Sequence, residues 1–234
     1  MLQASIVVPC YNEELRMKPF MDELLRRGKE NWEFIFVNDG SKDNTLRILK
    51  SYNFRNKKVI SYAKNRGKGY AVKSGILEAK GDYIIFIDVD GSIHPSHIKE
   101  MLKYLKRYDV VVGNRSLKES RVISPFFRKF TGVVFNILTR ILFGLKIKDC
   151  LCGFKGFKKR AARKLFGSLI SQRWVFDVEI YYKIKKSSYS VYELPIKWEH
   201  RDKSKMTLSE IIKVALELLS LRLKLMKIKM KKNS

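Results

Sequence analysis

Cysteine and proline are scarce in this sequence. Its 234 residues contain only 3 Cys and 5 Pro. The three thiols, Cys10, Cys150 and Cys152, cannot all pair within the chain, and Cys150 and Cys152 are too close together for an ordinary zinc knuckle. We therefore expect a reducing compartment, and with it a cytoplasmic location.

Long apolar runs are also missing. The best candidate, Phe130–Leu145, is interrupted by Asn136 and Arg140, and it falls short of the about 20 apolar residues that cross a bilayer. Residues 1–9 lack a basic lead and a long apolar core, so they indicate a strand rather than a signal peptide. We expect a chain that lies on a membrane without crossing it.

Acidic residues are few compared with basic ones. The chain has 23 Asp and Glu against 49 Lys and Arg, a formal net charge of +26. Residues 1–113 hold 20 basic and 14 acidic residues, a net charge of +6, whereas residues 114–234 hold 29 and 9, a net charge of +20. This excess favours association with a polyanion or an anionic membrane surface, mainly through the second half.

The remaining composition is that of an ordinary globular protein. Hydrophobic residues make up 45% and aromatic residues 12% of the chain, which excludes disorder as its main state. The length suits one α/β domain with a sizeable core. No internal repeat and no linker rich in Gly, Ser or Pro divides the sequence.

The first half alternates β-branched or aromatic runs with amphipathic stretches. The runs predict strands at Ala4–Pro9, Glu33–Asn38, Lys57–Tyr62, Tyr83–Ile87 and Asp109–Val112. The stretches between them predict helices at Glu13–Arg27, Asp43–Tyr52, Gly69–Ala79 and Pro95–Lys106. This alternation predicts an α/β fold with a mostly parallel, doubly wound sheet covered on both faces.

The second half has less regular patterns. We expect an amphipathic helix or helix pair at Ser124–Leu145, a loop at Asp149–Phe157, a strand or helix at Arg173–Lys185, an edge strand entering a polar loop at Pro195–Arg201 and a helix at Thr207–Leu221. Arg222–Lys232 alternates basic and apolar residues, which favours an interfacial or frayed tail.

Polar residues gather just after each predicted strand of the first half. The segments are Pro9–Glu14, Asn38–Ser41, Lys64–Gly69, Asp88–Ser92 and Gly113–Arg115. Ligands of open α/β sheets bind outside the carboxyl ends of the strands. The sequence therefore predicts one binding site built from these five loops.

Asp88 and Asp90 follow a buried strand, and carboxylate oxygens are ligands that hard divalent cations prefer. They predict Mg²⁺ or Mn²⁺ on a diphosphate; the alternative is a plain turn with Gly91.

Asp39 could accept a hydrogen bond from a base or ribose, or form a turn with Gly40 and Ser41. Lys68, between two glycines, could meet a phosphate, but neither a Walker loop nor a dinucleotide fingerprint is present, which disfavours NTP hydrolysis and hydride transfer.

Four ordered motifs resemble those of the GT-A fold, family 2 glycosyltransferases, and within them the dolichyl-phosphate mannose and glucose synthases. They read Pro9-x-Tyr11-Asn12-Glu13, Asn38-Asp39-Gly40-Ser41-x-Asp43-x-Thr45, Asn65-Arg66-Gly67-Lys68-Gly69-x-Ala71 and Asp88-x-Asp90. The resemblance covers about residues 4–205, and residues 65–69 together with 90–91 lean toward the glucose branch.

The resemblance implies an inverting, metal-dependent transfer of a hexose from UDP-glucose or GDP-mannose to a polyprenyl (dolichyl) phosphate at the cytoplasmic membrane face. Residues 1–205 would be the GT-A domain, with a nucleotide-binding half at 1–115 and an acceptor half at 116–205, and residues 206–234 a basic amphipathic helix or tail. The Ser at position 92 stands where the mannose branch commonly has Gln, and Cys152 stands in the Ser place of a segment reading Asp-x-x-Ser-Gly-Phe-Arg.

The resemblance also implies roles for individual residues. Catalysis would involve Asp88, Asp90, Arg115 and Arg128, with Asp88 and Asp90 holding Mg²⁺ or Mn²⁺. The nucleotide sugar would contact Pro9, Tyr11, Asn12, Glu13, Asp39, Lys68, Asp88, Arg201 and Lys205. His200 is a further candidate for the diphosphate, and Glu179 for orienting the sugar or for structural pairing.

A phosphate acceptor needs no catalytic base, because its second pKa is about 6 and it is already nucleophilic near neutral pH. Catalysis would then consist of positioning and of neutralising charge. A family 2 enzyme acting on a soluble or polysaccharide acceptor would instead need a carboxylate base, for which the second half offers Asp149, Asp177 and Glu179. We expect no nucleic-acid partner, because that reading leaves Asp88 and Asp90 unexplained.

Two further expectations concern surfaces and histidines. The basic segments Ser124–Leu145 and Leu208–Lys232 would recruit anionic lipid, each nearby Lys or Arg adding about 1 kcal/mol. His94 and His97 lie three residues apart and could be metal ligands, but a helix start at Pro95 favours simple exposure.

Overall fold

The computed structural model describes the chain except for residues 1, 30, 124–125, 146–148, 200–207 and 234, and except for the side chains of 126–134, 208–212 and 229–233. Its centre is a sheet of seven strands in the order β3-β2-β1-β4-β7-β5-β8. These are β1 (Ala4–Cys10), β2 (Trp32–Asn38), β3 (Lys57–Ser61), β4 (Tyr83–Ile87), β5 (Val110–Asn114), β7 (Phe154–Lys158) and β8 (Val191–Pro195). A separate pair, β6 (Arg121–Ile123) and β9 (Lys197–Glu199), completes the described strands.

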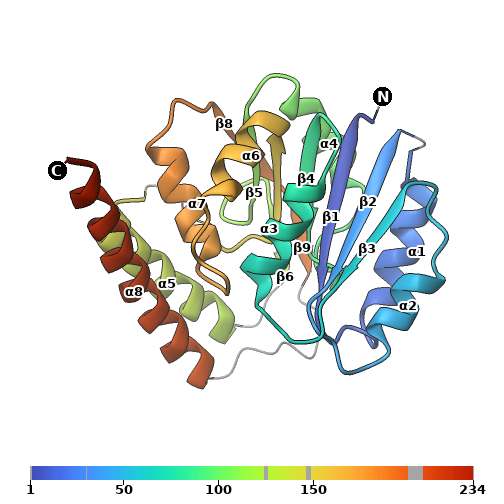
Figure 1. The fold of residues 1–234 in the computed structure, drawn as a ribbon, viewed down its shortest axis with the longest axis horizontal. Coiled ribbons are helices and arrows are strands. Elements are labelled where there is room, and N and C mark those ends of the chain that lie inside the picture. The colour runs from blue at the N-terminus through green and yellow to red at the C-terminus, as the bar shows by residue number, and fades with distance from the viewer. Residues whose placement is uncertain (1, 30, 124–125, 146–148, 200–207, 234) are drawn as a thin grey trace.

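All strands of the large sheet run parallel except β7, which is antiparallel to both β4 and β5. The register aligns the carboxyl ends of neighbouring strands. Cys10 at the end of β1 pairs with Asn38 at the end of β2, which in turn pairs with Ser61 at the end of β3. The loops that follow these strands therefore begin at one edge, the lower edge of the sheet in Figure 1.

Helices cover both faces of the sheet, as the alternation of buried side chains requires (Figure 1). One face packs on α1 (Met17–Arg27), α2 (Thr45–Ser51) and α4 (His97–Leu105), and the other on α3 (Lys68–Glu78), α6 (Lys159–Gly167) and α7 (Phe176–Lys185). Within β1, Ile6 and Val8 belong to the first core and Val7 to the second. This two-sided burial explains why the strands are apolar throughout rather than alternating.

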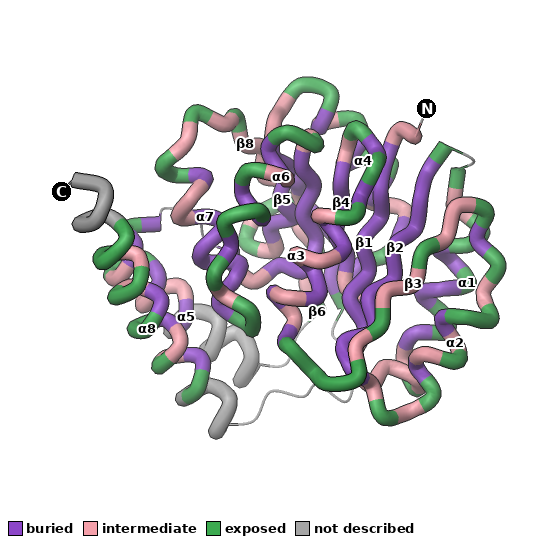
Figure 2. Tube along the Cα trace, in the orientation of Figure 1, coloured by how far each residue is buried: buried purple, intermediate pink, exposed green. Residues whose placement is uncertain are grey.

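An outer layer of two helices, α5 (Phe126–Phe143) and α8 (Leu208–Asn233), packs beyond α7. The two helices lie side by side at one end of the molecule (Figure 1). Phe135 and Phe143 of α5 share a buried core with Val214, Leu218 and Leu221 of α8. The opposite sides of both helices are exposed along most of their described length (Figure 2).

The structure confirms the predicted fold class and all the strands and helices of the first half, with boundaries shifted by a few residues. The largest shift is at α1, which begins at Met17 rather than at Glu13, because residues 14–16 form a turn before it. Arg173–Lys185, open between strand and helix, contains helix α7, and Ser124–Leu145 contains the single helix α5. The three cysteines are free and buried.

Two expectations for the second half are wrong. Residues 154–158 form β7 rather than part of a loop, because they are inserted between β4 and β5, where both faces of the strand are buried. Helix α8 continues through Arg222–Lys232, so this stretch is not a frayed tail, and an interfacial location stays a prediction. Leu225 packs against the core there, so this stretch retains one inward-facing side.

Candidate active site

The loops after β1 and β2 hold each other in place. Asn12 donates its backbone N–H to Ser41 Oγ at 3.0 Å and accepts the Lys42 N–H on its side-chain oxygen at 2.8 Å. Glu13 donates its backbone N–H to Thr45 Oγ1 at 2.7 Å. The predicted nucleotide-sugar segment of residues 9–13 is thus fixed by the Ser and Thr of the second motif, which explains why the two motifs occur together.

Asp39 organises the loop after β3. Its side chain is buried; Oδ1 accepts the Arg66 N–H at 2.8 Å, and Oδ2 accepts the Gly67 N–H at 2.8 Å and the Asn65 side-chain amide at 2.9 Å. These long-range bonds replace the local turn that was the alternative expectation. They tie the second motif to the third, and contact of Asp39 with a nucleoside stays a prediction.

The third motif places Lys68 at the first residue of α3. The Gly69 N–H donates to Arg173 O at 3.2 Å and the Tyr70 N–H to Gln172 O at 2.9 Å. A Cβ at Gly67 would lie 2.6 Å from Gln172 O, and one at Gly69 2.7 Å from Phe176 Cβ. Both glycines are therefore needed for close packing of the segment before α7, which fixes the backbone around Lys68.

The Lys68 ammonium contacts the Asp88 carboxylate. Its Nζ lies 2.7 Å from Oδ1 and 2.7 Å from Oδ2 of Asp88. Burial raises the pKa of Asp88, and the positive charge of Lys68 opposes this shift. Burial alone would lower the pKa of Lys68, but the negative charge of Asp88 raises it above its ordinary value, so Lys68 stays protonated beside the carboxylate.

Gly153 is a site residue that the sequence marked only through a resemblance. Its carbonyl accepts the Asp88 N–H at 3.0 Å, and a Cβ at position 153 would overlap Asp88 Oδ2. Asp88 is thus enclosed between the backbone of Gly153 and the side chain of Lys68. Only a glycine at this position leaves room for the carboxylate.

Asp90 completes the carboxylate pair expected to hold a cation. Its Oδ1 accepts the Ser92 N–H at 2.9 Å, and the side chain is partly exposed. In the described part of the chain no group of three or more His, Cys, Asp and Glu side chains gathers as a metal site. Two carboxylates fit Mg²⁺ or Mn²⁺ shared with a diphosphate, because such ions usually keep water and phosphate ligands besides one or two carboxylates.

A second lysine is fully buried behind Asp88. Lys155 Nζ donates to Asp177 Oδ1 at 2.7 Å, to Cys152 O at 2.6 Å and to Cys150 O at 3.2 Å. Burial raises the pKa of Asp177, and Lys155 opposes the shift. The sequence showed both residues but not their pairing, which depends on the strand β7 that sequence reasoning missed.

Arg115 is held by Asp149. Its Nε and Nη2 donate to the two carboxylate oxygens at 2.8 and 2.6 Å, and its backbone N–H adds a bond of 2.8 Å to Oδ2. Burial would raise the pKa of Asp149, but these bonds hold it below its ordinary value. The guanidinium carbon also lies 5.4 Å from the Trp198 ring centroid.

Glu179 is buried and has a structural role. It accepts the backbone N–H groups of Ile170 and Ser171 at 3.0 and 2.8 Å, and Lys183 Nζ lies 2.6 Å from Oε1. These bonds support the segment that packs on Gly67 and Gly69. Of the two alternatives for Glu179, orientation of a sugar or structural pairing, the contacts support the second.

The two neighbouring histidines contact protein groups. His94 Nε2 lies 3.4 Å from Glu23 Oε1, and His97 accepts the Lys197 N–H on Nε2 at 3.2 Å. Burial lowers the pKa of His97, which favours the neutral ring that accepts this bond. The predicted exposure holds for His94, whereas His97 is partly buried.

Several predicted residues cannot be placed in this site. The side chain of Arg128 lies outside the described residues, although its backbone belongs to α5. His200, Arg201 and Lys205 also lie outside the described part of the chain. Their contacts with phosphates stay predictions.

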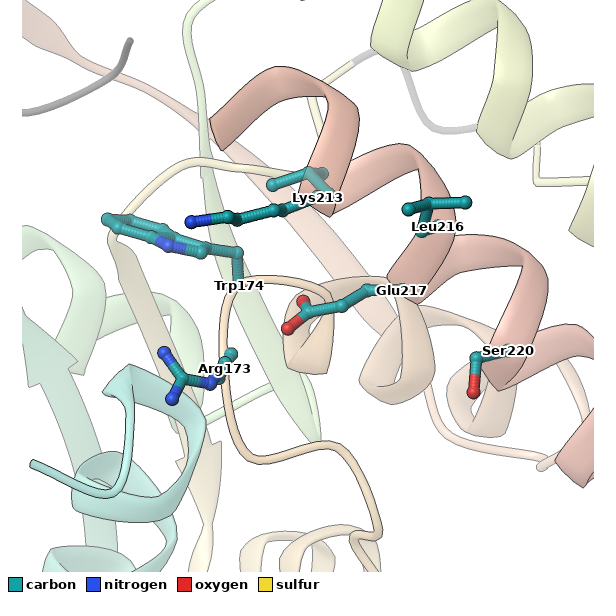
Figure 3. A pocket seen from close by; sticks show the side chains of 7 residues that line it. Arg173, Trp174, Lys213, Leu216, Glu217 and Ser220 are labelled. Atoms are coloured by element: carbon teal, nitrogen blue, oxygen red, sulfur yellow. The ribbon is translucent and has the colours of Figure 1, made fainter. Parts of the chain in front are cut away.

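A cavity of about 570 Å³ lies between the segment before α7 and helix α8 (Figure 3). Its lining consists of Arg173, Trp174, Lys213, Val214, Leu216, Glu217 and Ser220. Burial raises the pKa of Glu217, which points toward Arg173 from α8 (Figure 3). The Trp174 ring centroid is 6.0 Å from Lys68 Nζ, so the cavity lies next to the carboxylate cluster.

The parallel sheet, the carboxylate pair at its edge and the interlocked loops define a nucleotide-sugar transferase of the GT-A type. Comparison with known proteins agrees, because residues 5–166 match the sequence profile described as Glycosyl transferase family 2. The chain belongs to that family and is a glycosyltransferase.

Its curated relatives include dolichyl-phosphate beta-glucosyltransferases. One from Trichomonas vaginalis is 38% identical over 235 residues, covering 93% of this chain and 70% of the relative. The Saccharomyces cerevisiae protein is 32% identical, with 94% and 74% covered, and the Homo sapiens protein is 34% identical, with 87% and 69% covered.

Solved structures agree on the fold. Glucosyl-3-phosphoglycerate synthase from Mycobacterium tuberculosis, in complex with UDP, superposes with a TM-score of 0.71 at 18% identity, covering 95% of this chain and 79% of that one. Staphylococcus aureus TarS 1–349, in complex with UDP-GlcNAc, gives a TM-score of 0.61 at 17% identity, with 93% and 66% covered. At this identity the likeness establishes the GT-A fold alone.

Proposed function

We propose that the chain transfers glucose from UDP-glucose to a dolichyl or other polyprenyl phosphate. The relatives named above support the acceptor and favour glucose over the mannose that the motifs left open. UDP in the solved neighbour is consistent with a uridine donor. The contacts within the site indicate whether the acceptor is a phosphate or a hydroxyl group.

The observation that carries the proposal is the pairing of the three candidate bases. Asp149 is bound by Arg115, Asp177 by Lys155, and Glu179 by two backbone N–H groups and Lys183. All three carboxylates are buried. A hydroxyl acceptor must lose a proton to a base that reaches it, and none of these three meets that condition.

A phosphate acceptor does not need that base. Its oxygen is already anionic near neutral pH, so it can attack the anomeric carbon as the bond from that carbon to the UDP oxygen breaks. Attack from the opposite side inverts the anomeric centre, and no proton changes place. The pairing therefore favours a phosphate acceptor over a hydroxyl acceptor, and the names of the relatives favour a lipid as its carrier.

The residues then have distinct tasks. Residues 9–13 and Asp39 bind the nucleoside, Lys68 the diphosphate, and Arg115 with Arg128, Arg201 and Lys205 the phosphates. Asp88 and Asp90 would hold Mg²⁺ or Mn²⁺, an ion that would neutralise the departing diphosphate. The hard oxygen donors of both carboxylates support this assignment, and the missing Cβ at Gly153 lets the Asp88 carboxylate lie at this edge of the sheet.

The outer helices support a membrane location. Exposed apolar side chains on their described parts are Ile137, Ile141, Leu216, Leu219, Leu223, Met226 and Ile228. Exposed cations alternate with them at Arg140, Lys213, Lys224 and Lys227. No helix in the described part of the chain is long and apolar enough to cross a bilayer. We propose that this face rests on the anionic cytoplasmic surface, where the lipid acceptor resides.

A transfer assay tests the proposal. The chain is incubated with Mn²⁺, a short polyprenyl phosphate and either labelled UDP-glucose or labelled GDP-mannose, and the lipid fraction is counted. We expect label in the lipid from UDP-glucose, in a product with inverted anomeric configuration. Label from GDP-mannose alone, or label from neither donor, would contradict the proposal.

A further inference from the structure

The Lys68 ammonium occupies the position from which a cation would approach Asp88. Its Nζ is 2.7 Å from each of the two carboxylate oxygens, and Gly153 closes the opposite side of that carboxylate. A divalent ion on Asp88 and the Lys68 ammonium would be like charges within a few ångströms of each other. The two cations therefore compete for one carboxylate.

The backbone around Lys68 is fixed, so only the Lys68 side chain can move away from Asp88. Its neighbours Gly67 and Gly69 pack against the backbone of residues 171–173 with no room for a Cβ, and the Gly69 N–H is bonded to Arg173 O. The side chains of Lys68 and Asp88 retain 20% and 29% exposure, so the ammonium can leave toward solvent without moving the helix. A lysine stem is flexible enough for this change.

The charge balance of the cluster explains why Lys68, rather than Lys155, is the exchangeable cation. The three carboxylates of Asp88, Asp90 and Asp177 face the ammonium groups of Lys68 and Lys155. Lys155 is fully buried and bonded to Asp177 and two carbonyl groups. With Lys68 in place, the three carboxylates and two ammonium groups have a formal charge of −1, and a bound divalent ion would make the total +1. With Lys68 withdrawn, the formal charge is −2, and the ion would make the total zero.

We propose that Lys68 is an exchangeable stand-in for the metal: it neutralises Asp88 while the site is empty and moves onto the donor's diphosphate as the cation binds. Cation binding and nucleotide binding are then coupled, because the diphosphate supplies the new partner for Lys68. The inference rests on the proposed cation site and nucleotide donor, and it adds the order in which their charges are exchanged.

Mn²⁺ titration calorimetry on the full chain, with and without saturating UDP, tests this. For the wild type we expect UDP to tighten Mn²⁺ binding by at least about tenfold, within the usual range of coupling between two ligands. In Lys68→Met the dissociation constant for Mn²⁺ alone should fall about tenfold, and the effect of UDP should shrink to a few-fold. Lys68→Arg should resemble the wild type.

Lys58→Met is the matched control, because it removes the same charge from an exposed ion pair between Lys58 on β3 and Glu78 on α3. It should leave both Mn²⁺ affinities unchanged. Near-UV circular dichroism verifies the fold of each variant, and Lys68→Gln provides a second neutral side chain should Lys68→Met not fold.

Two results would overturn the exchange. If wild-type Mn²⁺ binding depends on UDP but the neutral variants bind Mn²⁺ alone no more tightly, the exchange is wrong while the cation site stands. If the wild type binds no Mn²⁺ even with UDP, the cation site of the proposed function is wrong, and the exchange with it.

Discussion

At the residue scale, each carboxylate of the site differs from the others in the group that neutralises it. Asp88 has the partly exposed Lys68, whereas Asp177 has the buried Lys155 and Asp149 has Arg115. Asp90 accepts a backbone N–H and remains partly exposed. The exchangeable partner and the partly exposed oxygens thus occur together at Asp88 and Asp90, which is why we assign the cation there.

Replacing Asp90 tests that assignment. Asp90→Ala should reduce glucosyl transfer by about 100-fold or more, the scale of losing one electrostatic stabiliser of a transition state. Thermal unfolding should change little, because the side chain is partly exposed. Asp82→Ala, an exposed position just before the same strand, is the control that should retain activity. Undiminished metal-dependent turnover in Asp90→Ala would contradict the assignment.

The Arg115–Asp149 pair predicts a pH dependence of stability. The pKa of Asp149 is depressed below the ordinary 3.8 in the folded state, so its ionised form stabilises the fold above that pH, and this contribution is lost as the pH falls through the depressed value. At neutral pH Asp149→Asn should lower the free energy of unfolding by about 3 kcal/mol.

Urea unfolding from pH 7 down to about pH 3 measures this difference. The gap between the wild type and Asp149→Asn should narrow as the pH falls below the ordinary Asp range. A gap that stays constant over the whole range would show that ionisation of Asp149 is not what stabilises the pair.

Some residues of the site could be predicted from the sequence, but their partners could not. Asp88, Asp90 and Lys68 could be found because they directly follow strands or glycine turns. The partners of Lys155 and Asp149 could not, because Asp177 and Arg115 are 22 and 34 positions away in the chain and meet only through tertiary packing. Asp149, Asp177 and Glu179 were named as candidate bases for the alternative acceptor; pairing was expected as an alternative for Glu179 alone, and the pairing of Asp149 and Asp177 was not.

At the element scale, β7 shapes the site more than any other strand of the second half. It enters antiparallel between β4 and β5 and brings Gly153 and Lys155 beside Asp88 and Asp177. Its sequence, Phe-Lys-Gly-Phe-Lys, has no β-branched residue, and its glycine and lysines are typical of loops. The parallel strands were predictable from their apolar runs, whereas this insertion depends on burial that the neighbouring strands provide.

A single methyl group added at Gly153, just before β7, should lower activity. In Gly153→Ala the new Cβ would overlap the Asp88 carboxylate, and a displacement of about 1 Å at a catalytic group can cost about 100-fold in rate. We expect a loss of that order in transfer, measured with saturating substrates. Gly167→Ala, where a Cβ would meet nothing within 4 Å, should keep full activity, and equal rates in both variants would refute this account of Gly153.

At the scale of the whole molecule, the chain divides into a catalytic sheet edge and an outer helical layer. Trp174 connects the two, since its ring lines the cavity against α8 and lies 6.0 Å from Lys68 Nζ. A membrane bound by α5 and α8 would therefore lie near the site. The net charge of +26 supplies the long-range attraction, and the exposed apolar side chains supply the contact.

Liposome flotation tests this membrane face. Binding to vesicles with anionic lipid should weaken as salt rises from about 0.1 M to about 1 M, because the screening length falls from about 10 Å to about 3 Å. Leu219→Asp combined with Leu223→Asp should weaken it further at constant salt. Leu25→Asp, an exposed apolar position on α1, should not; equal effects of the two variants would place the membrane contact elsewhere.

The central claim is that the acceptor brings its own negative charge, so that the site needs no base. The most direct measurement compares initial rates with UDP-glucose and Mn²⁺ for a polyprenyl phosphate and for the polyprenol of the same length. We predict transfer to the phosphate and no detectable transfer to the alcohol. Comparable rates for both acceptors, or transfer to the alcohol alone, would contradict the claim.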